Sequence, residues 1–298
     1  MRPANRYSRG GREMSGSQGG LENKVVEGGA PGAGGRVFGG VTPAVATDSS
    51  DRVYIARRDP PAILVYDSGG NFLAARGEDL FKNPHSVWFN DQDQMYVADV
   101  DDHTVRKLDT DGRVLQTLGT PDVPGAPGQP FNRPTWAVEG SGGDIYVSDG
   151  YGQFRVHRFS ADGTLLQSWG EEGTGPGQFA LPHGLRVDSR GRVLVLDREN
   201  RRMQIFDAEG TYIDEWPDLD GPNDLYIDSD DKVYMAEGNY RISVFDLDGE
   251  LLARWGEQGE APGQFANGPH GLWLDSQGDL YVAEVPFLDN RLQKFTQV

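Results

Sequence analysis

Three of the five histidines stand directly after a proline, in matching sequence contexts. They are His85, His183 and His270, within Asn-Pro-His-Ser, Leu-Pro-His-Gly and Gly-Pro-His-Gly. Three imidazoles brought to one point form a site for Zn²⁺ or another divalent ion, with a position left open for water or substrate. The alternative is that they are hydrogen-bonded structural histidines. We expect the other two, His103 and His157, to be structural.

Side chains suited to catalysis follow several apolar runs. Tyr151 stands two residues after Asp149 in Val-Ser-Asp-Gly-Tyr-Gly, where the glycines permit an exposed turn. A phenol close to a cation can act as a general base, although a loop tyrosine can equally be a packing residue. Arg57 stands where five matching segments carry an acid, and its planar fork suits a substrate carboxylate unless it forms an ordinary ion pair. Arg198 directly follows an aspartate and is a second candidate for the substrate site.

These residues belong to a pattern that recurs six times along the chain. Each copy contains apolar runs of four to six residues, separated by turns of the type Asp-x-x-Gly, as in short strands joined by hairpins. Six antiparallel sheets at a spacing of about 40 to 50 residues are typical of propeller blades. We therefore predict an all-β fold, a six-bladed β-propeller. The copies begin at Val41, Phe81, Phe131, Phe179, Gly221 and Phe265.

Alignment of the copies places the histidines in alternate blades. The position after the recurrent proline is occupied in order by Ala44, His85, Thr135, His183, Asn223 and His270. Pseudo-sixfold symmetry then sets the three imidazoles roughly 120° apart on the inner strands beside the axis. The end of the second strand carries Arg57, Asp99, Asp149, Asp197, Glu237 and Glu284. We expect most of these acids to accept hydrogen bonds within their own blade, and we assign no role to Asp99 or Asn223.

The two ends of the chain predict how the ring closes. The last copy ends at Val298 without a fourth strand, whereas residues 21–32 resemble residues 251–263, which follow the fifth copy's third strand. The N-terminal strand should therefore complete the C-terminal blade. We expect one domain over residues 21–298, preceded by a disordered tail over residues 1–20.

Composition excludes several classes of function. Asp and Glu outnumber Lys and Arg by 46 to 28, and the formal charge of −18 repels nucleic acids and anionic membranes. The absence of cysteine excludes disulfides, thiolate nucleophiles and Cys-ligated metals. No run of about 20 apolar residues is present, and the first 20 residues lack the apolar centre of a signal peptide. We expect a soluble, cytoplasmic protein.

The repeat resembles the NHL repeat family of six-bladed propellers over nearly the whole chain after residue 20. The resemblance rests on Pro-x-Gly-Leu, Tyr-Val-Ala-Asp, Asn-Arg-x-x-x-Phe and Asp-x-x-Gly. The candidate site, in addition, resembles the peptidyl-α-hydroxyglycine α-amidating lyase family, a six-bladed propeller with a three-histidine zinc site. The matching stretches are residues 83–85, 146–151, 177–183 and 197–200.

This second resemblance implies an activity and roles for the candidate residues. His85, His183 and His270 would bind zinc, Tyr151 would be the catalytic base, and Arg57 and Arg198 would lie in the substrate site. Enzymes of this family cleave an N-acyl-α-hydroxyglycine into a primary amide and glyoxylate. Arg57 would hold the carboxylate that becomes part of glyoxylate.

Departures from the family limit what the resemblance implies. Its animal members are secreted and disulfide-bonded, so a cysteine-free chain suggests a small hydroxylated amide rather than a peptide hormone as substrate. Gly268 and Gly271 replace a methionine and a calcium-linked aspartate of the family, which argues against structural calcium. Two alternatives stay open: a non-catalytic NHL propeller that binds a peptide or protein, and a metal-dependent hydrolase of the lactonase type.

Overall fold

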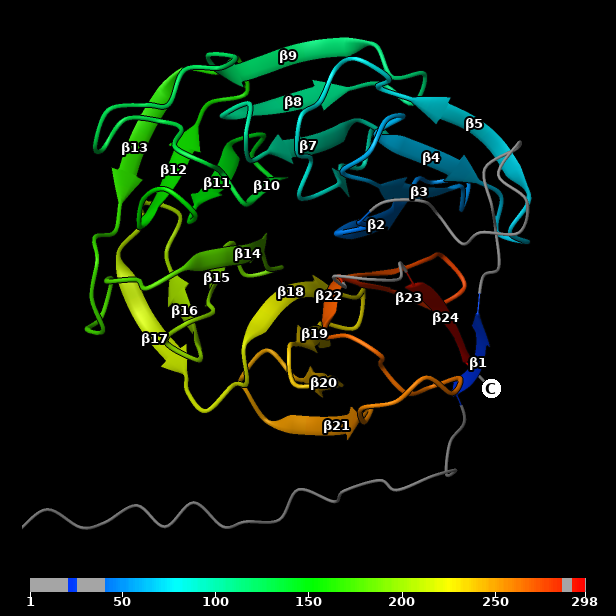
Figure 1. Ribbon diagram of the computed structural model, residues 1–298. Helices are drawn as coiled ribbons and strands as arrows, with labels where there is room; N and C mark the ends of the chain where they lie inside the picture. Colours follow the sequence, from blue (N-terminus) through cyan, green and yellow to red (C-terminus); the bar gives the residue numbers. More distant parts are fainter. Residues whose placement is uncertain (1–20, 26–40, 286–290, 298) are drawn as a thin grey trace, which may run out of the picture.

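The computed structural model describes residues 21–25, 41–285 and 291–297. Their strands form six four-stranded antiparallel sheets, arranged as a ring around a central axis (Figure 1). The predicted all-β, six-bladed propeller is therefore confirmed. Within the described ranges, no helix is long and apolar enough to cross a bilayer. The predicted disordered tail, residues 1–20, lies outside the described residues.

Five blades each consist of four consecutive strands, ordered from the axis outward. Blades 1 to 3 contain β2 (Ala44–Thr47), β3 (Val53–Ala56), β4 (Ile63–Tyr66) and β5 (Phe72–Arg76); β6 (Trp88–Phe89), β7 (Met95–Asp99), β8 (Thr104–Leu108) and β9 (Val114–Gly119); β10 (Trp136–Glu139), β11 (Ile145–Asp149), β12 (Arg155–Phe159) and β13 (Leu165–Trp169). Blades 4 to 6 contain β14 (Pro182–Val187), β15 (Val193–Asp197), β16 (Arg202–Phe206) and β17 (Tyr212–Trp216); β18 (Pro222–Ile227), β19 (Val233–Glu237), β20 (Arg241–Phe245) and β21 (Leu251–Trp255); β22 (Pro269–Leu274), β23 (Leu280–Glu284), β24 (Arg291–Gln297) and β1 (Leu21–Val25).

The last blade is completed by the N-terminal strand, as the sequence predicts. Strand β1 pairs antiparallel with β24, from Leu21 opposite Gln297 to Val25 opposite Gln293. Figure 1 shows the first strand, in blue, beside the last one, in red. This pairing covers the outer edge of β24 and joins the two ends of the ring, so the backbone groups of that edge are not left for another chain.

The hairpins are set by the recurrent Asp-x-x-Gly turns. In blade 4, the carboxylate of Asp207 accepts the backbone N–H groups of Glu209 at 3.0 Å and Thr211 at 2.7 Å. Gly210 has a φ of 78°, a conformation that costs glycine little because it has no Cβ. The aspartate and glycine thus fix the turn and, with it, the register of the two outer strands.

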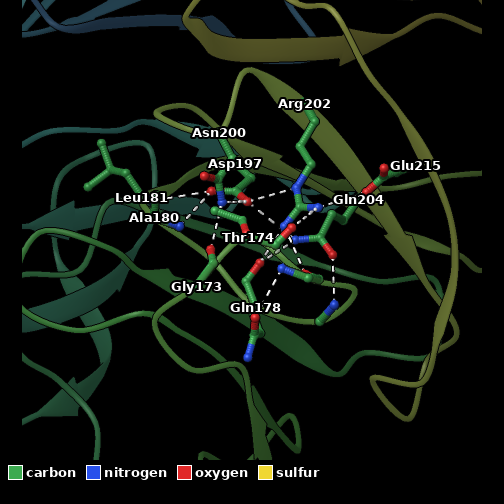
Figure 2. Close-up of polar contacts among 12 residues, drawn as sticks. Gly173, Thr174, Gln178, Ala180, Leu181, Asp197, Asn200, Arg202, Gln204 and Glu215 are labelled. Atoms are coloured by element: carbon green, nitrogen blue, oxygen red, sulfur yellow. Dashed lines mark hydrogen bonds and ion pairs between the residues drawn. The ribbon is translucent and has the colours of Figure 1, made fainter.

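In five blades the acid at the end of the second strand ties the loops together, and Figure 2 shows this network around Asp197. In blade 4, the fully buried Asp197 accepts the backbone N–H groups of Ala180 at 2.9 Å and Leu181 at 3.2 Å. It also accepts the Nε–H of Arg202 at 3.0 Å and the amide of Asn200 at 2.7 Å. The corresponding loop N–H groups in other blades donate to Asp99, Asp149, Glu237 and Glu284. The expected structural role of these acids therefore holds.

Replacement of Asp197 by Asn should strongly destabilise the propeller. The change removes the fully buried carboxylate of the Asp197–Arg202 pair and leaves Arg202 with only the partly exposed Glu215, and broken buried pairs cost up to about 3–5 kcal/mol. Asp248→Asn is the matched control, because its pair with Arg190 is exposed and should change stability by less than about 1 kcal/mol. Urea denaturation of both variants measures the difference, and equal losses of stability would contradict the assignment.

Candidate metal centre

The three predicted histidines converge on the propeller axis. His183 lies in β14 and His270 in β22, the inner strands of blades 4 and 6, whereas His85 precedes β6 in blade 2. One ring nitrogen from each lies within 4.8 Å of the other two. The geometry expected from alternate blades is therefore present, and it is one that a divalent metal ion can use.

Each imidazole is oriented by a backbone carbonyl of the following blade. The Nδ1–H group donates over 2.9 Å from His85 to Thr135, 2.6 Å from His183 to Asn223, and 2.7 Å from His270 to Pro43. A hydrogen bond at Nδ1 fixes the tautomer and leaves the Nε2 lone pair free to bind a metal. The three carbonyls thus turn three nitrogens that could bind a metal towards one point.

Burial keeps the three imidazoles neutral. His85 and His183 are fully buried and His270 is 6% exposed. Burial is the main cause that lowers the pKa of all three, for His270 to about 3. Neighbouring histidines and nearby arginines lower the pKa values of His85 and His183 further. Neutral imidazoles at pH 7 can bind a metal without first releasing a proton.

Tyr151 lies over two of the histidines. Its hydroxyl is 3.0 Å from Nε2 of His85 and 3.2 Å from Nε2 of His183. Tyr151 follows β11 in blade 3, between the two blades that carry these histidines. The structure therefore brings the predicted base to the edge of the candidate metal site, within reach of a hydroxyl group bound there.

Trp136, which sequence reasoning missed, packs against the whole triad. It is fully buried, and its ring centroid is 5.9, 6.1 and 6.4 Å from those of the three imidazoles. The Arg186 guanidinium lies 5.6 Å from the indole centroid and pairs with Asp224 at 3.1 Å. The sequence does contain a signal that Trp136 lies near the triad. Trp136 directly follows Thr135, the residue of blade 3 that aligns with the histidines.

The two predicted substrate arginines lie in different surroundings. Arg198 forms an ion pair with Glu199 at 2.8 Å, and its charge helps to lower the pKa values of all three histidines. Arg57 is only 6% exposed, and burial lowers its pKa against the charge of Asp59. The arginine of blade 1 whose charge acts on the histidines is the next residue, Arg58. The structure thus places Arg198 with His270 in the lining of one hollow, and it buries Arg57, whose place in the substrate site stays a prediction.

A hollow of about 550 Å³ opens beside His270. Its lining includes Arg198, Asn223, Gly221, Gly238 and Gly268, from blades 4, 5 and 6. Asn223, to which the sequence assigned no role, lines the cavity, whereas Asp99 is fully buried in the loop network of blade 2.

The residues present fit a zinc ion better than a structural calcium. Three imidazole nitrogens with their Nδ1 atoms already hydrogen-bonded are a donor set suited to zinc. At Gly271, a Cβ atom would come within 2.7 Å of the carbonyl oxygen of Pro43, so no carboxylate side chain fits there. The family's calcium-linked aspartate therefore has no counterpart at this position.

Fold and site together define a six-bladed propeller with a candidate metal centre on its axis. The NHL repeat family model matches residues 179–206. NHL repeat-containing protein 3 of Homo sapiens is 34% identical over 273 residues, which cover 83% of this chain and 78% of that protein. The chain belongs to the NHL repeat family.

Similarity to amidating lyases covers part of the chain. Peptidyl-alpha-hydroxyglycine alpha-amidating lyase 1 of Drosophila melanogaster is 33% identical over 149 residues, which are 46% of this chain and 27% of that protein. Among solved structures, a streptogramin B lyase superposes with a TM-score of 0.67 at 13% identity, over 95% of this chain and 100% of that chain. The similarity to the streptogramin B lyase shows only that the two proteins share a fold.

Wild-type protein purified without chelator or nickel resin should contain about one zinc ion per chain. His183→Ala removes one of three ligands and should abolish metal retention. His103→Ala is the control, because that ring accepts a loop N–H from Arg133 outside the triad. Elemental mass spectrometry measures all three samples. Absence of metal from wild-type protein after dialysis against zinc would contradict the site.

The metal-free protein should lose stability as the pH falls from 7 to 5. Unfolded histidines take up protons below about pH 6.5, whereas the buried triad stays neutral, at a cost of about 2 kcal/mol per imidazole at pH 5. Burial raises the pKa of Asp224 to about 6 and also raises the pKa values of Asp99 and Glu284, so these carboxyl groups act in the opposite direction, and a histidine variant isolates the contribution of the triad. Urea denaturation across this range should show a weaker pH dependence in His183→Asn; an unchanged slope would contradict the prediction.

Proposed function

We propose that this protein is a zinc-dependent carbon–nitrogen lyase that acts on a small carbinolamide of the N-acyl-α-hydroxyglycine type. The observation that carries the proposal is the Tyr151 hydroxyl, which lies 3.0 and 3.2 Å from two of three converging imidazoles. The similarity to an amidating lyase of Drosophila melanogaster supports the same reaction class. The products would be a primary amide and glyoxylate, or a related aldehyde.

The triad would hold the metal through the Nε2 atoms of His85, His183 and His270. When bound, zinc supplies a Lewis acid that stabilises negative charge on a substrate oxygen. The protein's own contribution is to present neutral, correctly oriented imidazoles and to keep the site apolar on the side of Trp136.

Tyr151 would move the proton in this reaction. In its phenolate form it would remove the proton of the carbinolamide hydroxyl, and the electrons of that O–H bond would form the new C=O bond as the C–N bond breaks. The electrons of the C–N bond would pass to the amide nitrogen, which would take the same proton back from the Tyr151 hydroxyl and leave as the primary amide. The step needs no water and no oxidant, since the atoms of the substrate are divided between the two products.

The hollow beside His270 favours a small molecule as the partner. Its volume of about 550 Å³ fits a compact ligand, and its rim carries charged and amide side chains such as Arg198 and Asn239. We include in this proposal a cytoplasmic location, a small hydroxylated amide as substrate, and no nucleic-acid or membrane partner.

Tyr151→Phe should lower the rate of aldehyde release from an α-hydroxyglycine amide by about 10²–10⁴-fold, because the base is lost. Zinc content should not change, since the imidazole ligands remain. Tyr212→Phe, on the outer strand β17, is the matched control and should retain activity. Glyoxylate release is measured with a coupled assay. Undiminished turnover in Tyr151→Phe with zinc bound would contradict the proposed role.

The non-catalytic alternative also has an observation in its favour. The relative that aligns with 83% of this chain is named for its repeats rather than for a reaction. A propeller that only binds a peptide or protein would tolerate Tyr151→Phe and would need no stoichiometric metal. The metal and turnover measurements therefore separate the two functions.

A further inference from the structure

A buried ion pair on the inner strands of the propeller has no part in the reaction proposed for the site. Arg186 lies in β14 of blade 4 and Asp224 in β18 of blade 5, and these residues are 5% and 1% exposed. The Nη2 atom of Arg186 is 3.1 Å from Oδ1 of Asp224. The cost of taking two charges out of water can exceed the attraction between them, so a buried pair is weak evidence for stability. Stability alone therefore does not explain this pair.

The three histidines of the triad belong to three different sheets. They lie in blades 2, 4 and 6, and among the described strands no strand of one blade pairs with a strand of another. Hydrogen bonds between strands therefore fix each blade internally but do not set the distances between blades. A metal site tolerates only small errors in the position of its ligands, on the order of 0.5 Å. Contacts between blades must therefore set the distances between the imidazoles.

The ion pair is a contact of this kind, and it lies close in the chain to the triad. Arg186 is three residues after His183 on the same strand, β14. Asp224 directly follows Asn223, whose carbonyl oxygen accepts the Nδ1–H of His183 at 2.6 Å. The pair thus joins the strand that carries His183 to the strand that orients it.

The carboxylate of Asp224 continues this link to blade 6. Its Oδ2 atom accepts the backbone N–H of Leu272 at 3.0 Å, two residues after His270 on β22. One carboxylate therefore connects the inner strands β14, β18 and β22 (Figure 1). Two of these strands carry an imidazole of the triad, and the third carries a carbonyl that orients one.

The guanidinium of Arg186 extends the link to blade 3. Its central carbon is 5.6 Å from the ring centroid of Trp136, the indole that packs against all three imidazoles. Nη1 donates to the carbonyl oxygen of Leu185 at 2.8 Å, whereas Nε makes no hydrogen bond within the described part of the chain. Contacts with the indole and with Asp224 thus hold this side chain between blades 3, 4 and 5.

We propose that Arg186 and Asp224 are positioning residues of the metal centre. They hold the inner strands of blades 4, 5 and 6, together with the indole of Trp136, in the arrangement that brings three imidazole nitrogens to one point. Neither side chain binds the metal itself. The inference rests on the candidate metal centre and is independent of the lyase reaction, because ligand geometry can be measured without turnover.

Cobalt(II) binding to the full chain tests this role, because the visible absorption of bound cobalt depends on the number and arrangement of its ligands. Arg186→Met removes the charge and keeps an apolar side chain against the indole. It should change the absorption spectrum and weaken cobalt binding by about 10–100-fold, as expected when a group that orients metal ligands is lost. Asp224→Asn should act in the same direction. Arg186→Lys retains the charge and should recover part of the affinity.

Arg202→Met is the matched control. It breaks another buried ion pair of blade 4, the one with Asp197, which belongs to the loop network of Figure 2. This variant should lower the free energy of unfolding, whereas its cobalt affinity and absorption spectrum should match those of the wild type.

Unchanged cobalt affinity and absorption in folded Arg186→Met would overturn the proposal. An equal loss of affinity in Arg202→Met would do the same, because it would indicate a general effect of stability. If Arg186→Met does not fold, wild-type affinity in both Asp224→Asn and Arg186→Lys would overturn it. Wild-type protein that binds no cobalt would overturn the metal centre and this inference together. The expected pattern in protein that releases no glyoxylate would support this inference and contradict the lyase function.

Discussion

The hydrogen bonds from the three imidazole Nδ1 atoms to backbone carbonyls are the interaction on which the site depends. Each bond crosses from a histidine-bearing blade to the next blade, over 2.6–2.9 Å. Asn223 lies in β18, and Thr135 and Pro43 directly precede β10 and β2, so the direction of each carbonyl is fixed by the backbone and does not depend on a side-chain rotamer. Any change that shifts two adjacent blades would therefore also turn a metal-ligating nitrogen.

Histidine occupies the inner position only in alternate blades, and this spacing has a physical reason. If all six inner positions carried histidine, each ring would need a carbonyl partner and also space on the axis. Here blades 2, 4 and 6 provide imidazoles, and blades 3, 5 and 1 provide the carbonyls of Thr135, Asn223 and Pro43. The odd-numbered blades are thereby free to differ at the mouth, where Tyr151 of blade 3 reaches two of the histidines and Gly238 of blade 5 lines the hollow. A symmetric metal site thus acquires an asymmetric entrance.

The repeat made most of the fold predictable. Turn residues and apolar runs recur at each blade, so blade number, strand order and closure by residues 21–25 follow from alignment. The convergence of His85, His183 and His270 follows for the same reason. That the charge of Arg58 acts on His85 and His270 could not be predicted in this way, because adjacent residues near a strand end point in different directions. Trp136 was missed because its contacts come from three other blades.

Charges close to the site, rather than the net charge of the whole protein, decide how an anionic ligand is recognised. A net charge of −18 repels an anionic ligand at a distance, but at physiological salt this repulsion is screened beyond about 8 Å. The blade acids nearest the axis are committed to loop N–H groups and arginines, as Asp197 is in Figure 2, so they contribute little free negative charge to the mouth. Neutral imidazoles add none. A divalent ion bound there would therefore keep most of its positive charge inside an otherwise acidic protein.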